Sequence, residues 1–151
     1  MFRGDPDVAS CTAAPGCCGA RVAILGLRIP EAGMASIENL EALRVRLAEF
    51  AAERDWAQFH SPKNLAMALA AEAGELLEHF QWLTEQESAA LPEETRTEVA
   101  LEMADVLLFL VRIADRLQID LLEAATEKLA LNASKYPVEK ARGRATKYDR
   151  L

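Results

Sequence analysis

Residues 34–151 contain no cysteine and few residues that interrupt helices. All three cysteines of the chain, five of its seven glycines and three of its six prolines lie in residues 1–33. The scarcity of glycine and proline in the rest of the chain predicts that it is mostly helical. A cysteine-free body gives no support for disulfides, and we therefore expect a cytoplasmic protein.

The chain also lacks long hydrophobic runs and an excess of positive charge. No apolar run approaches the roughly 18 residues that a membrane-spanning helix needs. The apolar patch at residues 22–27 is preceded by Asp5 and Asp7 near the start, where a signal peptide carries positive charge, so export is not expected. The net charge of −7 argues against binding to nucleic acid or to an anionic membrane, because both need a basic face.

Residues 1–33 show no helical or strand period longer than a few residues, and their composition predicts a disordered extension. Cys11, Cys17 and Cys18 do not complete a structural zinc site, which needs a fourth ligand. Two interpretations stay open for this segment. One is a flexible tail whose cysteines bind metal; the other is a stretch upstream of the true start at Met34, or an extension without function. We expect the working domain over residues 34–151.

Apolar residues recur at steps of three and four through most of the remaining chain, as in helices with one buried face. Ser61 before Pro62 and Asp120 before Glu123 are typical helix starts, and Pro137 disfavours helical geometry at the residue before it. Helices are predicted over 36–54, 62–82, 92–117 and 120–136, with a polar loop over 83–91 and a basic, less ordered tail over 138–151. The expected fold class is all-α, a four-helix bundle.

The segment 106–111 is apolar on every side of its predicted helix. A helix of a small monomeric bundle keeps one face in solvent, so this segment indicates that a second chain covers it. The sequence therefore predicts a homo-oligomer, a dimer or a tetramer, built through helix packing.

Carboxylates fall on the inward faces of two neighbouring predicted helices. At about 100° per residue, Glu72 and Glu75 lie on the same apolar arc as Leu65. Glu102 and Asp105 share one face of the next helix, at the edge of its most apolar stretch. An unpaired ionised acid in such a position costs several kcal/mol.

No lysine or arginine lies close to these acids on the same faces. Carboxylates without counter-charge repel one another and take up protons unless a divalent cation sits between them, and oxygen ligands favour magnesium or manganese. A solvated acidic face is the alternative, since Glu-x-x-Glu also occurs by chance, as at Glu38 and Glu41. His79 lies on the same arc as Glu72. It is expected to have a structural role, or to contact the metal-binding carboxylates without binding the metal itself.

The spacing Glu72-x-x-Glu75 and Glu102-x-x-Asp105 resembles the metal motif of the MazG-like all-α nucleoside triphosphate pyrophosphohydrolases. Further segments resemble the dCTP pyrophosphatase branch: Phe50–Trp56, Gln58–His60, Asn64–Leu65, Gly74–Leu76, Phe80–Trp82 and Lys135–Pro137. The resemblance covers about residues 36–150. It implies hydrolysis of a deoxynucleoside triphosphate, with dCTP and modified cytosine nucleotides favoured, to the monophosphate and pyrophosphate, as control of the nucleotide pool.

The same resemblance implies that Glu72, Glu75, Glu102 and Asp105 bind Mg²⁺, with Mn²⁺ as an alternative. Bound ions would offset the triphosphate charge, polarise the α-phosphoryl group and lower the pKa of the attacking water. Phosphoryl transfer needs mainly positioning and charge stabilisation, so no nucleophilic side chain is required. We expect Glu72 to act as the general base.

Two further groups of residues are expected to contact the substrate. Trp56 and Trp82 flank a slot that would stack a pyrimidine and that His60 would close, although two core tryptophans and a capping histidine are the alternative. The second group would clamp the triphosphate from one face of the last helix, unless its side chains are simply solvated. Its members are Lys128, Asn132 and Lys135, with Tyr136 after them.

Two other functions stay open, and a third is disfavoured. Pocket shape rather than the metal motif sets base choice, so the same fold would act on dUTP or another non-standard nucleotide. A carboxylate-bridged di-iron bundle wants Glu-x-x-His from paired helices, and the third predicted helix has no histidine. A non-enzymatic interaction module would tolerate replacement of the acids and would not be stabilised by magnesium.

Overall fold

The structure, a computed structural model, describes residues 36–150. The predicted extension over residues 1–33, with its cysteines and the proposed start at Met34, lies outside the described residues. Within them the elements are α1 (Leu40–Glu53), the 3₁₀ helix η1 (Trp56–Gln58), α2 (Pro62–Glu78), α3 (Glu85–Ser88), α4 (Glu93–Leu117), α5 (Leu121–Lys135), α6 (Val138–Ala141) and the 3₁₀ helix η2 (Tyr148–Arg150). Residues 36–150 contain no strand, which confirms the all-α prediction.

Side-chain caps set the starts of three of the four long helices, α1, α2 and α5. Asn39 caps α1 by accepting a hydrogen bond from the backbone N–H of Ala42 at 2.8 Å, so this helix begins later than the predicted Ser36. Ser61 caps α2 as predicted, with proline at the first helical position. Asp120 caps α5 through two backbone N–H groups.

Short helices occur in two segments that we predicted to be irregular. In the loop 83–91, Thr84 and Glu87 form a reciprocal capping box that begins α3. In the tail, the chain forms the short helices α6 and η2. Tyr148 of η2 packs edge-to-face on Tyr136, with ring centroids 6.0 Å apart. Local contacts therefore order segments that carry little hydrophobic periodicity.

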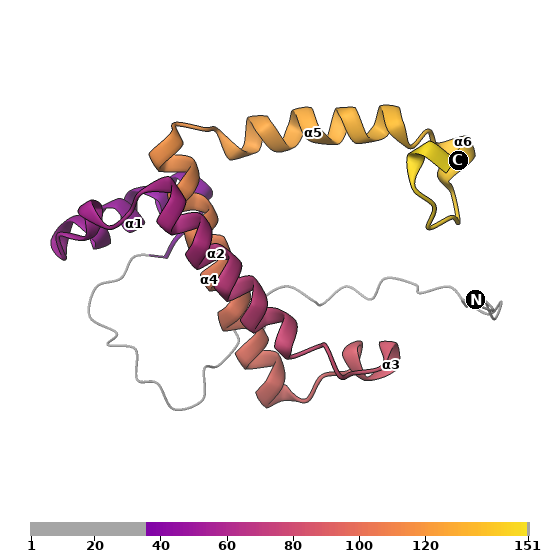
Figure 1. Ribbon diagram of the computed structural model, residues 1–151, viewed down its shortest axis with the longest axis horizontal. Helices are drawn as coiled ribbons and strands as arrows, with labels where there is room; N and C mark the ends of the chain where they lie inside the picture. The colour runs from indigo at the N-terminus through magenta and orange to yellow at the C-terminus, as the bar shows by residue number, and fades with distance from the viewer. Residues whose placement is uncertain (1–35, 151) are drawn as a thin grey trace.

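The core lies where α2 packs along α4 and α1 crosses the end of α4 (Figure 1). Its buried apolar side chains come from these three helices: Leu43, Ala51, Leu65, Val99, Val111 and Ala114. No helix among residues 36–150 is long and apolar enough to cross a membrane.

The fourth long helix does not close a bundle within one chain. Gln118, at the end of α4, has a left-handed backbone with φ of 55°, and it redirects the chain so that α5 runs away from α1 and α2 (Figure 1). α5 makes little contact with the other helices, and Leu122 and Leu129 stay 63% and 69% exposed. The four predicted long helices are present, but a single chain packs only three of them together.

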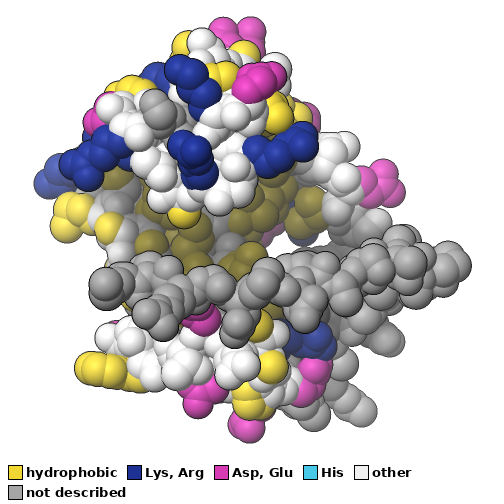
Figure 2. All heavy atoms as spheres, turned by 90° about the vertical axis from the view of Figure 1, so that its right-hand side faces the viewer, with side chains coloured by type: hydrophobic (Ala, Val, Ile, Leu, Met, Phe, Trp, Pro, Cys, Tyr) yellow, Lys and Arg dark blue, Asp and Glu magenta, His cyan; other side chains and the backbone are white. Residues whose placement is uncertain are grey.

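Apolar side chains are also exposed on α4. Leu107 and Leu110 lie in the segment that we predicted a second chain to cover, and each is 40% exposed. Figure 2 shows hydrophobic side chains open to solvent in the recess below the C-terminal region, on which lysine and arginine side chains gather. A single chain therefore leaves exposed the apolar face of α4 that the sequence predicts to be buried.

Within residues 36–150, Leu65 is the largest side chain that is almost completely removed from solvent. We expect Leu65→Ala to lower the free energy of unfolding by about 2–5 kcal/mol, because it leaves a cavity between α2 and α4. Urea denaturation followed by circular dichroism measures this loss. Leu77→Ala, at a position 61% exposed on the same helix, is the control and is expected to cost about 0.5 kcal/mol or less. Equal losses would contradict the packing described.

Candidate functional site

Three carboxylates from α2 and α4 converge. Oxygen atoms of Glu72, Glu102 and Asp105 all lie within 4.8 Å of one another. Glu102 and Asp105 stand one turn apart on α4, and the packing of α2 along α4 brings Glu72 to them. The tertiary contact thus converts two sequence spacings into one cluster of acids.

The cluster is electrostatically strained. Burial raises the pKa of Glu72, and the negative charges of Glu75, Asp105 and Glu102 raise it further. Oε2 of Glu102 is buried and has no hydrogen-bond partner among the described residues. A hard divalent cation would satisfy this orphaned acceptor and relieve the repulsion, and an all-oxygen donor set fits magnesium or manganese.

Glu75 stands apart from these three acids. Its side chain is exposed and does not belong to the group whose oxygens converge, although its charge still acts on Glu72. His79 also stays outside the cluster, with Nδ1 at 4.0 Å from Oε2 of Glu98. The structure therefore brings together three of the four ligands that the resemblance implies.

A pocket of about 320 Å³ opens beside the cluster, between α1, η1, α2 and α4. The residues that line it are Leu47, Phe50, Ala51, Trp56, His60, Leu65, Asp105, Leu108, Phe109 and Arg112. The ring of Trp56 meets those of Phe50 and His60 edge-on, with centroids 5.8 and 6.3 Å apart. Because Asp105 belongs to both the pocket and the acid cluster, the two features form one continuous site. A mostly apolar cavity with a few polar groups is typical of a small-molecule site.

The polar end of this pocket includes a residue that sequence reasoning missed. Nε of Arg112 donates a hydrogen bond to Nδ1 of His60 at 3.3 Å. Burial lowers the pKa of His60, and the charges of Arg112 and Arg116 lower it further, so these surroundings favour the neutral imidazole. The sequence feature that could have indicated this role is that Arg112 is a lone charge directly after the apolar segment 106–111.

Trp82 does not join this pocket. Its side chain is 86% exposed in the turn that follows α2, which ends at Glu78 rather than at the predicted residue 82. Trp56 and Trp82 therefore do not form a slot within one chain, because the shorter helix leaves Trp82 on a solvent-facing turn.

The predicted phosphate clamp is also not assembled within one chain. α5 runs away from α2, so its face with Lys128, Asn132 and Lys135 is not brought to the acids (Figure 1). Nζ of Lys135 lies 5.1 Å from the ring centroid of Tyr148, against which Tyr136 also packs. The redirected junction between α4 and α5 is the physical reason for this difference.

A sequence model of the MazG-like family matches residues 67–151. The chain is 47% identical to dCTP pyrophosphatase 1 of Mus musculus and 46% identical to that of Homo sapiens, each over 115 residues that cover 75% of this chain and 68% of the relative. The chain belongs to the MazG-like family. A solved pyrophosphatase from Archaeoglobus fulgidus is 37% identical, with a TM-score of 0.63 over 70% of this chain and 99% of that protein.

These relatives confirm the predicted resemblance, including its dCTP pyrophosphatase branch. They also confirm the predicted enzyme class, a nucleoside triphosphate pyrophosphatase. The roles of the individual site residues stay predictions.

Removing one charge from the acid cluster is expected to stabilise the metal-free protein. Because the pKa of Glu72 is raised on folding, its ionisation costs stability above that pKa, so Glu72→Gln should raise the melting temperature at pH 7. The gain should vanish below the ordinary pKa of a glutamate, where Glu72 is protonated in both the folded and the unfolded state. Thermal unfolding in EDTA at several pH values measures it.

The matched control is Glu78→Gln, at an exposed position on the same helix and outside the cluster. Added magnesium should raise the melting temperature of the wild type and of Glu78→Gln more than that of Glu72→Gln. A melting temperature of Glu72→Gln equal to that of the wild type in EDTA would contradict the strained cluster.

Proposed function

We propose that this protein catalyses the magnesium-dependent hydrolysis of dCTP, or of a related or modified cytosine nucleotide, to the monophosphate and pyrophosphate, as control of the nucleotide pool. The observation that carries the proposal is the convergence of three acids at one side of an apolar, aromatic pocket. Such a pocket accepts a flat base, while cations held by the acids bind the polyanionic chain. The relatives named dCTP pyrophosphatase 1 support a cytosine base.

Glu72, Glu102 and Asp105 would hold the cation, with Glu75 added from the next turn of α2. When bound, magnesium offsets phosphate charge, polarises the α-phosphoryl group and acidifies the attacking water. Glu72 would take up the proton of that water at its carboxylate. Trp56 and His60 would hold the base in the pocket.

A homo-oligomer, a dimer or a tetramer, would complete this site. Its formation would bury the exposed leucines of α4 and α5, among them Leu107, Leu110 and Leu129. α5 of a second copy would then bring a phosphate clamp to the acids of its neighbour. The clamp consists of Lys128, Asn132, Lys135 and Tyr136, and Trp82 would close the aromatic slot in the same assembly.

The full chain is expected to release pyrophosphate from dCTP in the presence of magnesium and not in EDTA. Glu102→Gln should lower kcat/KM by about a hundredfold or more, because it removes a ligand of the cation. Glu78→Gln is the control. A panel of deoxynucleoside triphosphates tests the base: hydrolysis of dUTP alone would overturn the cytosine assignment, and hydrolysis of none would overturn the enzymatic function.

Sedimentation velocity tests the assembly. The wild type is expected to sediment as a dimer or a tetramer, and Leu129→Glu should shift it toward the monomer by placing a charge on the apolar face of α5. Glu127→Gln, at an exposed position beside it, should leave the assembly intact. A monomeric wild type would contradict the oligomer, and so would a Leu129→Glu variant that assembles normally.

A further inference from the structure

Arg112 is a buried charge whose position the core packing does not explain. Its side chain is 9% exposed, and Nη1 donates to Oδ2 of Asp115 at 2.6 Å. Both residues of this pair belong to α4, so the pair does not connect α4 to another helix. Since apolar residues often stabilise a core as well as a buried ion pair does, pairing alone gives no reason for an arginine here.

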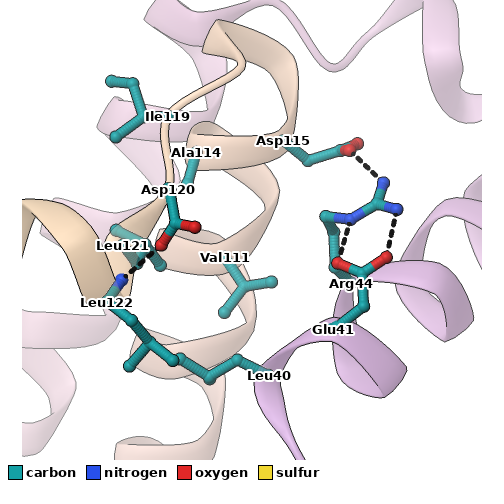
Figure 3. Close-up of a pocket in the computed structure, with 10 residues that line it drawn as sticks. All are labelled: Leu40, Glu41, Arg44, Val111, Ala114, Asp115, Ile119, Asp120, Leu121 and Leu122. Atoms are coloured by element: carbon teal, nitrogen blue, oxygen red, sulfur yellow. Dashed lines mark hydrogen bonds and ion pairs between the residues drawn. The ribbon is translucent and has the colours of Figure 1, made fainter.

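Asp115 has a second partner that already balances its charge. Its Oδ1 accepts from Nη1 of Arg44 on α1 at 2.7 Å, and Arg44 in turn makes two hydrogen bonds to Glu41 (Figure 3). The line of charges runs from solvent to the interior, with side chains that are 69%, 40%, 14% and 9% exposed from Glu41 to Arg112. The ion pair of Arg44 with Asp115 therefore connects α1 to α4 without Arg112. The same Asp115 fixes the guanidinium of Arg112 through its other oxygen.

The remaining edge of Arg112 faces the nucleotide pocket. Its Nε–H donates to Nδ1 of His60, and both residues line the pocket wall. An arginine side chain has only donors and stays protonated, so Nδ1 of His60 must accept through its lone pair. The neutral imidazole then carries its proton on Nε2, which has no hydrogen-bond partner among the described residues.

We propose that Arg112 is a positioning residue for base recognition, which fixes His60 as the Nε2–H tautomer and thereby makes this histidine a hydrogen-bond donor at the polar end of the pocket. This inference rests on the proposed function and deepens it. Cytosine presents two adjacent acceptors, O2 and N3, whereas uracil and thymine carry a proton on N3. A donor that meets N3 therefore selects cytosine by the type of hydrogen bond rather than by size.

The tautomer of His60 is the first test. In the full chain with ¹⁵N-labelled histidine, NMR should show His60 protonated on Nε2 and not on Nδ1. Arg112→Lys keeps the positive charge beside Asp115 but loses the planar fork, so His60 should exchange between tautomers. Arg112→Met should do the same without the charge. His79, the other histidine of the chain, is the internal reference.

Base selectivity is the second test. With magnesium, the ratio of kcat/KM for dCTP to that for dUTP should fall by up to about tenfold in Arg112→Lys, mainly through KM for dCTP, as expected for the loss of one hydrogen bond between neutral groups. Arg116→Met is the matched control. It removes a neighbouring positive charge that acts on His60 but does not line the pocket, and it should keep the ratio.

An unchanged tautomer and ratio in Arg112→Lys would overturn the proposal, as would a loss confined to the free energy of unfolding. If the wild type hydrolyses no nucleotide, the proposed function fails by itself. The NMR measurement then still decides the contact between Arg112 and His60, and calorimetric dissociation constants for dCTP and dUTP in magnesium decide whether the pocket selects cytosine.

Discussion

The packing of α2 along α4 is the contact on which the rest of the structure depends. Burial of apolar side chains such as Leu65 and Val99 holds the two helices together, and the same register brings Glu72 to Glu102 and Asp105. Apolar burial thus offsets a repulsion that would otherwise separate the acids. The result is a folded protein in which three acids lie close together and repel one another.

The buried and half-buried side chains of α4 include both acids and an arginine, and the two kinds differ in whether a counter-charge lies beside them. The acids near Asp105 lack counter-charges, whereas Arg112 is balanced within a line of ion pairs that reaches the surface. Asp105 and Arg112 lie seven residues apart, about two helical turns or 10 Å, on the wall of one pocket. α4 therefore sets the distance between the acid cluster and the contact of Arg112 with His60, which fits the proposed ligand, with phosphate at one end and a base at the other.

The single chain encloses little beyond this pair of helices. Among the described residues few apolar side chains are fully buried, while leucines of α4 and α5 stay exposed. The left-handed backbone at Gln118 carries α5 away from its own core, so the chain offers a helix face without covering it. The incomplete core and the separation of the Lys128 face of α5 from the acids are two consequences of the same turn.

Short-range features were determined by the sequence alone: the four long helices, most of their starts and the helix faces that carry acids. Capping chemistry and hydrophobic period act within a few residues, so Ser61 or the spacing of Glu102 and Asp105 can be interpreted without a fold. Periodicity states which side chains share a face but not which faces meet. Only the tertiary structure separated Glu75 from the other acids, turned α5 away and brought Arg112 to His60, because each of these depends on packing between elements or on one backbone angle.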